Sequence, residues 1–345
     1  MNKNTKIGLV AATLAAVVAV LVGSGQNITI RDDQTLNGYF GTVTVSGVGT
    51  PDDYIEVDGS ATMKCLVLSG QYIHVTGMNV TGCAGHGVLI TGKNIVFENS
   101  TVHGTVTENG TGKCSGSGGW GSAVKVQVGG ENVVIRGNQV FENCGEGIAS
   151  TRGVNVTIEN NLAYDNFSVN IYVDNTRGAA VRWNDAKCAN PNYYRNGQPG
   201  GGIGLGAENY SGWGYQLQDV TIENNTMEGC KGIRLYEDSA LASGSPKNIL
   251  IQNNLFVNSF QSVLVNVESA VSINNVAVSA VQGTSTPSRT PNATVIASAT
   301  PSRTATKSAT PLPATVPATL PPAPSSTPTV VCVPAFSVWV CNGKP

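Results

Sequence analysis

The sequence predicts an all-β protein built as a solenoid of parallel coils, and three observations support this fold class. A unit, NVVIRGN at 132–138, returns as NVTIENN at 155–161, which is 23 residues later. Apolar residues alternate with polar ones inside each unit, as expected of strands rather than helices. Strands about 23 residues apart cannot form hairpins, whose loops usually hold two to five residues. The strands are therefore expected to stack in parallel, one coil on the next.

The first 25 residues are typical of a secretory signal peptide. Lys3 and Lys6 precede the apolar run Ile7–Val22, and small residues follow at 23–25. Because this run is short for a membrane span, residues 1–25 are interpreted as a signal peptide. An uncleaved N-terminal anchor is the alternative.

The composition fits export and limits the classes of partner. Only 12% of the residues are charged, glycine is abundant at 41 residues, and the formal net charge is −2. This balance offers no electrostatic basis for binding nucleic acid. The expected location is therefore outside the cell, either secreted or at the cell surface.

Residues 26–282 are predicted to form the solenoid. Its first part is less regular and is expected to supply the first coils and a cap for the open end. The candidate strands there are 28–30, 42–45, 54–57 and 65–68. Further copies of the repeated unit start at Tyr72, Asn94, Gly178, Asp219 and Asn248. With the two copies above, these give seven readable coils.

An asparagine follows the first strand of successive coils in one register. These residues are Asn138, Asn161, Asn184, Asn225 and Asn254. Asparagine tolerates a left-handed bend, and stacked asparagine side chains can bond to one another along the axis. In these repeats the chain resembles the right-handed parallel β-helix proteins of the pectate-lyase-like superfamily, over roughly residues 27–280. The resemblance implies the fold but not one function, because that fold carries lyases, hydrolases, epimerases, tailspikes and adhesins.

Two longer spacings interrupt the repeat and predict inserted loops. The distance between consecutive units grows from 23 residues to 38 and 41 at two places. The excursions are expected at about 104–120 and 186–216, on the same side of the solenoid. Repeat proteins usually carry their function on such loops.

Eight cysteines in a chain predicted to be exported suggest disulfides. In the fold that the resemblance implies, each excursion cysteine lies near a corner cysteine of the next coil. The predicted pairs are Cys65–Cys83, Cys114–Cys144, Cys188–Cys230 and Cys332–Cys341. The alternative is that the corner cysteines are simply small apolar residues.

The composition changes after residue 282. Residues 283–330 contain ten prolines, three basic residues and no acid, so they are predicted to be a disordered Thr/Pro-rich linker. Residues 331–345 are interpreted as a small Cys-containing segment. The tail is expected to attach the protein to a cell surface.

The outward positions of the first strands alternate in charge. The column reads Thr76, Glu98, Arg136, Glu159, Arg182, Glu223 and Gln252. Exposed cross-strand pairs contribute about 0.2–1 kcal/mol each, and alternating charges also fix the register. This column is predicted to be a structural ladder rather than a site.

The second strands present a different outward surface. Tyr172 and Asp174 lie on one coil, Gly204 and Gly206 on the next, and Arg234 with Tyr236 on the third. The glycines are expected to leave an open floor between two polar banks. The aromatic residues expected to overhang this groove and bind sugar rings are Tyr193, Tyr194, Tyr210 and Trp213. The alternative is a solvated polar face.

The resemblance to polysaccharide lyases implies roles for these residues. A lyase removes the proton beside a uronate carboxylate and neutralises that carboxylate with a cation or Ca²⁺. The candidates for base or cation are Arg234 and Lys125. The candidates for the proton donor are Tyr172 and Tyr236. The candidate Ca²⁺ ligands are Asp174, Glu237 and Asp238.

Gly85-His86-Gly87 matches one motif of the polygalacturonase-type hydrolases, but the accompanying acidic motifs of that family are absent. His86 is therefore interpreted as a corner histidine, and glycoside hydrolysis is less favoured. The predicted function is a secreted polysaccharide lyase acting on an acidic glycan. The alternative is a non-catalytic adhesin, glycan-binding or structural protein.

Overall fold

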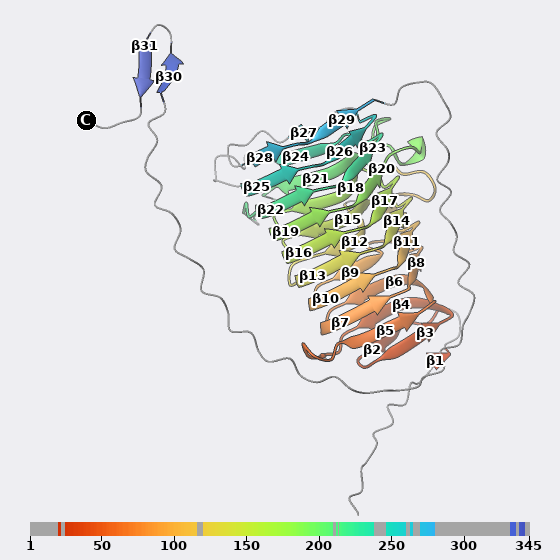
Figure 1. Ribbon diagram of the computed structural model, residues 1–345. Helices are drawn as coiled ribbons and strands as arrows, with labels where there is room; N and C mark the ends of the chain where they lie inside the picture. The colour runs from red at the N-terminus through yellow and green to blue at the C-terminus, as the bar shows by residue number, and fades with distance from the viewer. Residues whose placement is uncertain are drawn as a thin grey trace, which may run out of the picture. The chain divides into compact units, whose positions relative to one another are not determined.

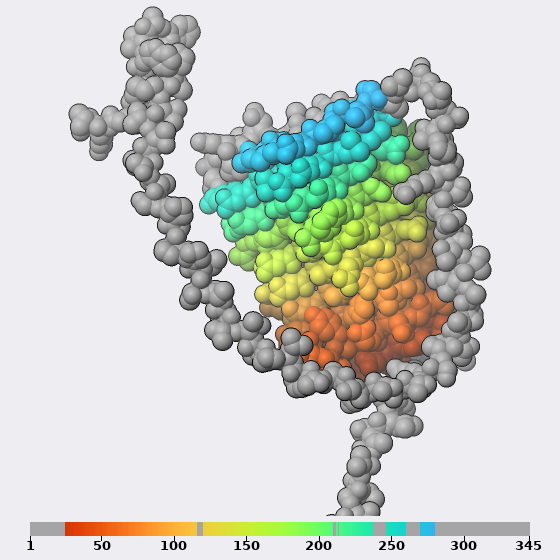
Figure 2. Space-filling view, viewed as in Figure 1, coloured from red at the N-terminus to blue at the C-terminus, as the bar shows by residue number. Residues whose placement is uncertain are grey.

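The computed structural model forms a parallel β-helix in which each coil lies on the one before it (Figure 1). The residues that it describes are 25–115, 120–209, 214–237, 246–259 and 270–279, with short pieces at 20–21, 212, 263–264, 332–335 and 338–341. The coils follow one another in chain order along the β-helix (Figure 2). No helix among these residues is long and apolar enough to cross a bilayer.

Each regular coil contains three strands, whereas the sequence indicated two. One coil consists of β13 (Glu131–Arg136), β14 (Gln139–Phe141) and β15 (Glu146–Thr151). Its neighbour consists of β16 (Val154–Glu159), β17 (Leu162–Tyr164) and β18 (Val169–Asp174). Equivalent strands pair in parallel along the axis. The middle strand holds three residues, too few to show an alternating pattern in the sequence.

The first strands of the coils form one sheet, called here the ladder sheet. It also includes β1 (Val20–Leu21), β3 (Gln34–Asn37), β5 (Ile55–Gly59), β7 (Gln71–Thr76), β10 (Lys93–Glu98), β19 (Arg177–Arg182), β22 (Gln218–Glu223), β25 (Lys247–Gln252) and β28 (Ala270–Ile273). The other middle strands are β8 (Asn79–Thr81), β11 (Thr101–His103), β20 (Asp185–Lys187), β23 (Thr226–Glu228), β26 (Leu255–Val257) and β29 (Val276–Val278).

The third strands of the coils are called here the cavity strands. Besides β15 and β18 they are β9 (Val88–Ile90), β12 (Ser122–Val126), β21 (Gly201–Ala207), β24 (Ile233–Glu237) and β27 (Val263–Leu264). The first coils use β2 (Ile28–Ile30), β4 (Tyr39–Val45) and β6 (Thr62–Leu68). Since β6 pairs with both β8 and β9, one long strand there becomes two strands in later coils.

The core runs through the centre of the coils. Alternate residues of every strand point inward, so Val133 and Ile135 of β13 are fully buried together with Val140 and Ile148 of the same coil. Each inward residue lies on its equivalent in the next coil, as Ile135 pairs with Ile158. Burying such a side chain contributes roughly 1.5–3 kcal/mol, so the coil stack stabilises itself without a globular centre.

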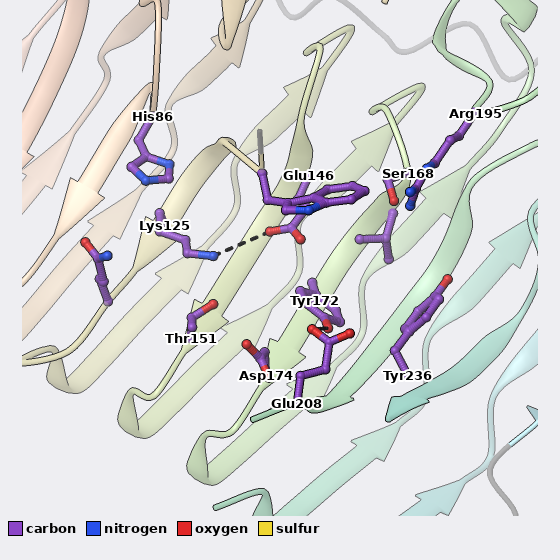
Figure 3. A pocket seen from close by; sticks show the side chains of 13 residues that line it. His86, Lys125, Glu146, Thr151, Ser168, Tyr172, Asp174, Arg195, Glu208 and Tyr236 are labelled. Carbon is purple, nitrogen blue, oxygen red and sulfur yellow. Dashed lines mark hydrogen bonds and ion pairs between the residues drawn. The ribbon is translucent and has the colours of Figure 1, made fainter. Parts of the chain in front are cut away.

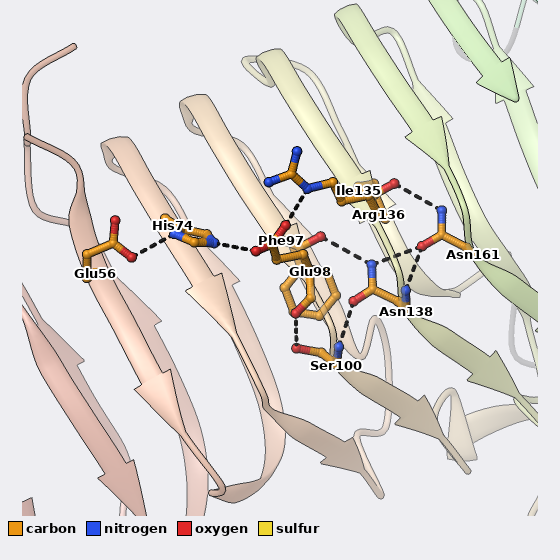
Figure 4. Close-up of polar contacts among 9 residues, drawn as sticks. All are labelled: Glu56, His74, Phe97, Glu98, Ser100, Ile135, Arg136, Asn138 and Asn161. Carbon is orange, nitrogen blue, oxygen red and sulfur yellow. Dashed lines mark hydrogen bonds and ion pairs between the residues drawn. The ribbon is translucent and has the colours of Figure 1, made fainter. Parts of the chain in front are cut away.

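The predicted asparagine ladder is present inside the coils (Figure 4). The side-chain nitrogen of Asn161 donates to Asn184 and to the Ile135 carbonyl, both at 3.0 Å. Its side-chain oxygen accepts from the backbone and side-chain nitrogens of Asn138, also at 3.0 Å. The ladder residues are buried, which makes these bonds costly to lose.

The expected left-handed conformation belongs to the residue before each ladder asparagine. Asn160 precedes Asn161 with φ +55°, and Trp183 precedes Asn184 with φ +54°. The bend thus turns the chain at the preceding residue, and this turn points the ladder side chain inward. The sequence prediction placed the conformation one residue too late.

The ladder sheet carries the predicted charge ladder on its outer surface. Arg182 donates to Glu159 at 2.9 Å, and Arg136 donates to Glu98. His74 lies 2.9 Å from Glu98 and 2.6 Å from Glu56 (Figure 4). Burial acts to raise the pKa of Glu98, but hydrogen bonds from Arg136 and His74 outweigh it and hold the pKa below its ordinary value.

Three of the predicted disulfides are confirmed: Cys65–Cys83, Cys114–Cys144 and Cys188–Cys230. The fourth falls on β30 (Cys332–Ala335) and β31 (Val338–Cys341), an antiparallel pair whose register places Cys332 opposite Cys341. The side chains of these two strands lie outside the described residues. So do the predicted linker at 283–330 and most of the predicted signal peptide.

The predicted second excursion is two loops rather than one. Strands β20 and β21 remain in the coil, so the extra residues divide into one segment between β20 and β21 and a second between β21 and β22. The first loop contains the 3-10 helix Pro191–Tyr193. The excursion between β11 and β12 is where it was predicted and contains the 3-10 helix Thr107–Asn109.

Candidate functional site

A cavity of about 600 Å³ opens on the outer side of the cavity strands, beneath the inserted loops. Its size falls in the usual range for small-ligand sites. Figure 3 shows polar side chains from neighbouring coils pointing into it. The lining residues are His86, Trp120, Lys125, Gln127, Glu146, Thr151, Ser168, Val169, Tyr172, Asp174, Arg195, Glu208 and Tyr236.

Strand register brings these side chains together. Lys125, Ala149, Tyr172, Gly204 and Arg234 form one column across neighbouring coils. The next outward column contains Thr151, Asp174, Gly206 and Tyr236. Both columns agree with the alignment predicted from the sequence. Neighbouring coils are ~4.8 Å apart, so side chains from four or five coils can face one cavity.

Tyrosine rings occupy the space above the two glycines, which was predicted to be open. A Cβ on Gly204 would lie 2.8 Å from the Tyr172 ring and 3.1 Å from the Tyr236 ring. The two rings meet edge to face, with centroids 6.0 Å apart. Gly204 and Gly206 therefore lie beneath the tyrosines and do not line the cavity, contrary to their predicted contact with substrate.

The Lys125 end of the cavity contains a buried polar network. Ser122 donates from its hydroxyl to Glu146 at 2.8 Å, and Lys125 Nζ lies 3.5 Å from the same carboxylate oxygen. The backbone nitrogen of Ser122 donates to His86 Nδ1 at 3.0 Å. Burial, and secondarily the charge of Lys125, lower the pKa of His86 to about 4, so its imidazole is neutral near pH 7. The predicted corner histidine is thus also a cavity residue.

The opposite part of the cavity holds two carboxylates beside Tyr172. The Tyr172 hydroxyl donates to Glu208 at 3.1 Å. Asn175 donates to Asp174 at 3.0 Å and to the Glu208 carbonyl at 2.6 Å, and so ties the two residues together. Burial first, and then the charges of Asp174 and Glu208, raise the pKa of Tyr172 far above its ordinary value. Its hydroxyl therefore stays a hydrogen-bond donor at every ordinary pH.

Tyr236 is half-buried at the end of the cavity nearest Arg234. Burial raises its pKa, although the charges of Arg234 and Arg195 oppose that effect. The Arg234 guanidinium lies 5.5 Å from the Tyr236 ring centroid and does not line the cavity. The predicted role of Arg234 at the reacting group therefore has no geometric support, because the side chain packs along the tyrosine instead.

Two inserted loops form the rim. The Arg195 guanidinium lies over the Trp120 ring, 4.2 Å from its centroid, and the nitrogen of Cys114 donates to the Asn192 carbonyl at 3.2 Å. The disulfides of Cys114 and Cys188 fix each loop to its coil. The aromatic rim was expected from the second excursion, yet its described aromatic residue, Trp120, comes from the first.

Tyr193 and Tyr194 do not line the cavity. Tyr193 is 5% exposed, and the Tyr194 hydroxyl lies 3.4 Å from the Cys188 carbonyl. Tyr210 and Trp213 lie outside the described residues. Neither tyrosine could be placed from the sequence, because Tyr193 ends the 3-10 helix of the loop and Tyr194 follows it, where the repeat no longer fixes position.

The predicted calcium ligands can be located only in part. Calcium takes six to eight oxygen ligands, and no group of three or more His, Cys, Asp or Glu comes together in the described part of the chain. Of the predicted ligands, Asp174 bonds to Asn175, while the Glu237 side chain and Asp238 lie outside the described residues.

Comparison with known proteins reinforces the fold. The family model described as right handed beta helix region matches residues 54–207 and 113–294. A tailspike protein double mutant of E. coli bacteriophage HK620, in complex with pentasaccharide, is 13% identical with a TM-score of 0.48; the match covers 76% of this chain and 58% of that one. The A-module of mannuronan C-5 epimerase AlgE6 from Azotobacter vinelandii is 11% identical with a TM-score of 0.40, over 73% and 88% of the two chains. No curated protein matches the chain.

Proposed function

The chain belongs to the right-handed β-helix family, and we propose that it binds a glycan in the cavity and hydrolyses it. One observation carries the proposal: Asp174 and Glu208 flank the Tyr172 hydroxyl inside a cavity with an aromatic rim. A methyl group on Gly206 would contact the Tyr172 hydroxyl and lie 2.6 Å from Asp174 Oδ1, so these groups share one small region. Glycoside hydrolysis needs such a pair of carboxyl groups on either side of the scissile bond.

The two carboxyl groups differ in their surroundings. Asp174 is 4% exposed, which suits a group that protonates the leaving oxygen as the bond between the sugars breaks. Glu208 is half-buried and accepts the Tyr172 hydrogen bond, which orients its carboxyl group in the cavity. Glu208 would take a proton from the water whose oxygen bonds to the anomeric carbon. The reaction consumes one water molecule. Each of the two products contains one of the sugars that the cleaved bond had joined.

The cavity favours an uncharged sugar chain. With Asp174 protonated as the acid, the carboxylates Glu146 and Glu208 balance the cations Lys125 and Arg195, and Lys125 is already paired with Glu146. The cavity therefore offers no surplus of positive charge to a uronate. Trp120, which is 51% exposed at the rim, offers an apolar ring face to the C–H face of a sugar.

Elimination from an acidic glycan is the second candidate. It is favoured by Arg195, an exposed rim cation with no ion-pair partner among the described residues, which could neutralise a uronate carboxylate. Lys125 is less suited to that role because Glu146 neutralises it. Tyr172 or Tyr236 would then supply the proton to the leaving oxygen.

The three disulfides support an oxidising compartment, so we propose that the protein acts outside the cell. Its partner would be a polysaccharide reached from that side. Attachment through residues 283–345 to a cell surface remains a prediction from composition.

The product distinguishes the candidate functions. The full-length chain is incubated with a panel of neutral and acidic polysaccharides, and new reducing ends and ultraviolet absorbance of unsaturated uronate are both followed. Hydrolysis predicts reducing ends without the unsaturated product. Asp174→Asn and Glu208→Gln are each expected to lower kcat about a hundredfold or more.

Glu228→Gln is the matched control, because Glu228 forms an exposed pair with Lys187 at 3.4 Å on a middle strand. It should retain full activity. Unsaturated product would establish the lyase instead. Glycan binding with neither product would identify a binding module, and the hydrolase proposal would fall.

A further inference from the structure

Thr151 leaves a polar group unused between Lys125 and Asp174 in the cavity (Figure 3). The residue is 4% exposed and lines the cavity, and its Oγ1 is buried without a hydrogen-bond partner among the described residues. Buried hydroxyl groups are nearly always bonded to protein, water or ligand. A hydroxyl in this state on a cavity wall can bond to a molecule bound in the cavity.

His86 adds a hydrogen-bond donor whose position is fixed. A backbone N–H can only donate, so the bond from Ser122 requires the lone pair of the imidazole to be on Nδ1. The proton of the neutral ring is then on Nε2, on the opposite side of the imidazole. Because His86 lines the cavity, this N–H is available to a bound molecule (Figure 3).

Lys125 supplies further donors at the same end without adding net charge. Its ammonium group has three N–H bonds, and the buried Glu146 carboxylate balances its charge. This end of the cavity therefore presents several N–H donors in an electrically neutral setting. The complementary ligand group is an uncharged acceptor, a carbonyl oxygen, rather than a carboxylate.

We propose that this end of the cavity is a subsite for the acetamido group of an N-acetylated sugar. His86 Nε2 and Lys125 Nζ donate to the carbonyl oxygen, and the Thr151 hydroxyl bonds to the amide or a neighbouring hydroxyl of the same sugar. The inference rests on the proposed function of the cavity, since it assigns the substrate class for that site.

Calorimetric binding to the full-length chain tests the subsite. The probes are an N-acetylglucosamine oligomer and a glucose oligomer of equal length and linkage, which differ in the acetamido group alone, and a galacturonic acid oligomer. The acetylated oligomer is expected to bind about tenfold more tightly than the glucose oligomer. Equal affinity, or preference for the uronate, overturns the proposal.

Three variants assign that preference to residues. Thr151→Val and His86→Phe should each reduce the acetylated-to-glucose affinity ratio severalfold, while His86→Gln, which keeps an N–H donor, should retain most of it. Thr151→Val should leave Tm unchanged or raise it, because it removes a buried hydroxyl that nothing bonds. Thr157→Val on the outer surface of β16 is the control and should change neither quantity. An unchanged ratio in Thr151→Val contradicts the subsite.

This test is separable from that of the hydrolase. Absence of cleavage together with the expected binding ratios removes the hydrolysis and leaves the subsite standing. The opposite result is also possible. If Asp174→Asn abolishes cleavage but the Thr151 and His86 variants keep the acetylated-to-glucose affinity ratio of wild type, the hydrolysis stands and the subsite is removed.

Discussion

The ladder sheet and the cavity strands point polar residues outward in opposite settings. On the ladder sheet, Glu159 and Arg182 bond to each other across neighbouring coils beside solvent. On the cavity strands, Lys125 and Glu146 form the same kind of pair, yet both are less than 10% exposed and face a hollow. The same repeat thus supplies both a scaffold and a site. The two surfaces differ in burial because the inserted loops cover the cavity strands and leave the ladder sheet beside solvent.

The comparison predicts that the scaffold depends most on its buried asparagines. Asn161→Ala removes the side-chain bonds to Asn138, Asn184 and the Ile135 carbonyl, so the buried Asn138 backbone nitrogen and the Ile135 carbonyl lose these partners. The free energy of unfolding should fall by about 4 kcal/mol, since each buried unpaired group costs about 1–3 kcal/mol. Denaturation with guanidinium measures it.

The exposed asparagine ladder on the same sheet provides the control. Asn132 has φ +53° and its side chain bonds to Asn94 and Asn155 at the surface. Asn132→Gly keeps that conformation available and should cost less than about 1 kcal/mol. Similar losses in the two variants would mean that burial does not distinguish the ladders.

The two ion pairs allow the settings to be compared directly. Glu146→Gln leaves the buried Lys125 ammonium without its carboxylate and should destabilise the protein by about 3 kcal/mol. Glu159→Gln removes the same charge from the partly exposed pair with Arg182, which is less buried than Lys125–Glu146, and should cost less than about 1 kcal/mol. Comparing the denaturation midpoints of the two variants with that of wild type measures both losses. A larger loss in Glu159→Gln would contradict the contrast between the sheets.

Acid should lower the free energy of unfolding through protonation of His86. The folded pKa of His86 is about 4, below its ordinary 6.5, so between these values the unfolded chain binds a proton that the folded chain does not. The contribution of His86 to stability is therefore constant above pH 6.5 and falls as the pH drops from 6.5 to 4. At 1.36 kcal/mol per pH unit, this loss is at most about 3.4 kcal/mol.

Denaturation of wild type and His86→Phe at several pH values between 4 and 7 measures this contribution. The difference in slope between the two proteins in that window isolates His86. Identical slopes would show that the imidazole becomes protonated as easily in the folded protein as in the unfolded chain.

Much of the fold could be predicted from the sequence, because repetition reports on stacking directly. The register that pairs Tyr172 with Gly204 and Arg234 follows from aligning the repeats, and so did the three disulfides once the fold was assumed. The middle strands were missed because three residues show no periodicity. The position of the left-handed residue was misjudged because asparagine occupies both sites, as at Asn160 and Asn161.

The site was only partly predictable. Lys125, Tyr172, Asp174 and Tyr236 lie on strands, and alignment placed them correctly along the cavity strands. The other lining groups come from strand ends and loops, where the repeat no longer fixes position: His86, Trp120, Glu146, Arg195 and Glu208. Side-chain direction was the second difficulty, since Arg234 follows the Tyr236 ring and the tyrosines cover the glycines.

Two tryptophans offer the most direct test that the cavity side, and not the ladder sheet, carries the function. Trp120 and Trp183 are 51% and 48% exposed, and each lies beside an arginine, at 4.2 Å and 4.7 Å from ring centroid to guanidinium. Their exposure and their arginine contacts are alike, but Trp120 is at the cavity rim, whereas Trp183 follows a ladder strand and has a left-handed backbone conformation.

The deciding measurement is glycan affinity and cleavage by Trp120→Ala and Trp183→Ala at equal folded concentration. We expect Trp120→Ala to weaken binding about tenfold, in line with an aromatic contact of 1–2 kcal/mol, and Trp183→Ala to match wild type. Equal effects, or a loss confined to Trp183→Ala, would contradict the assignment of function to the cavity.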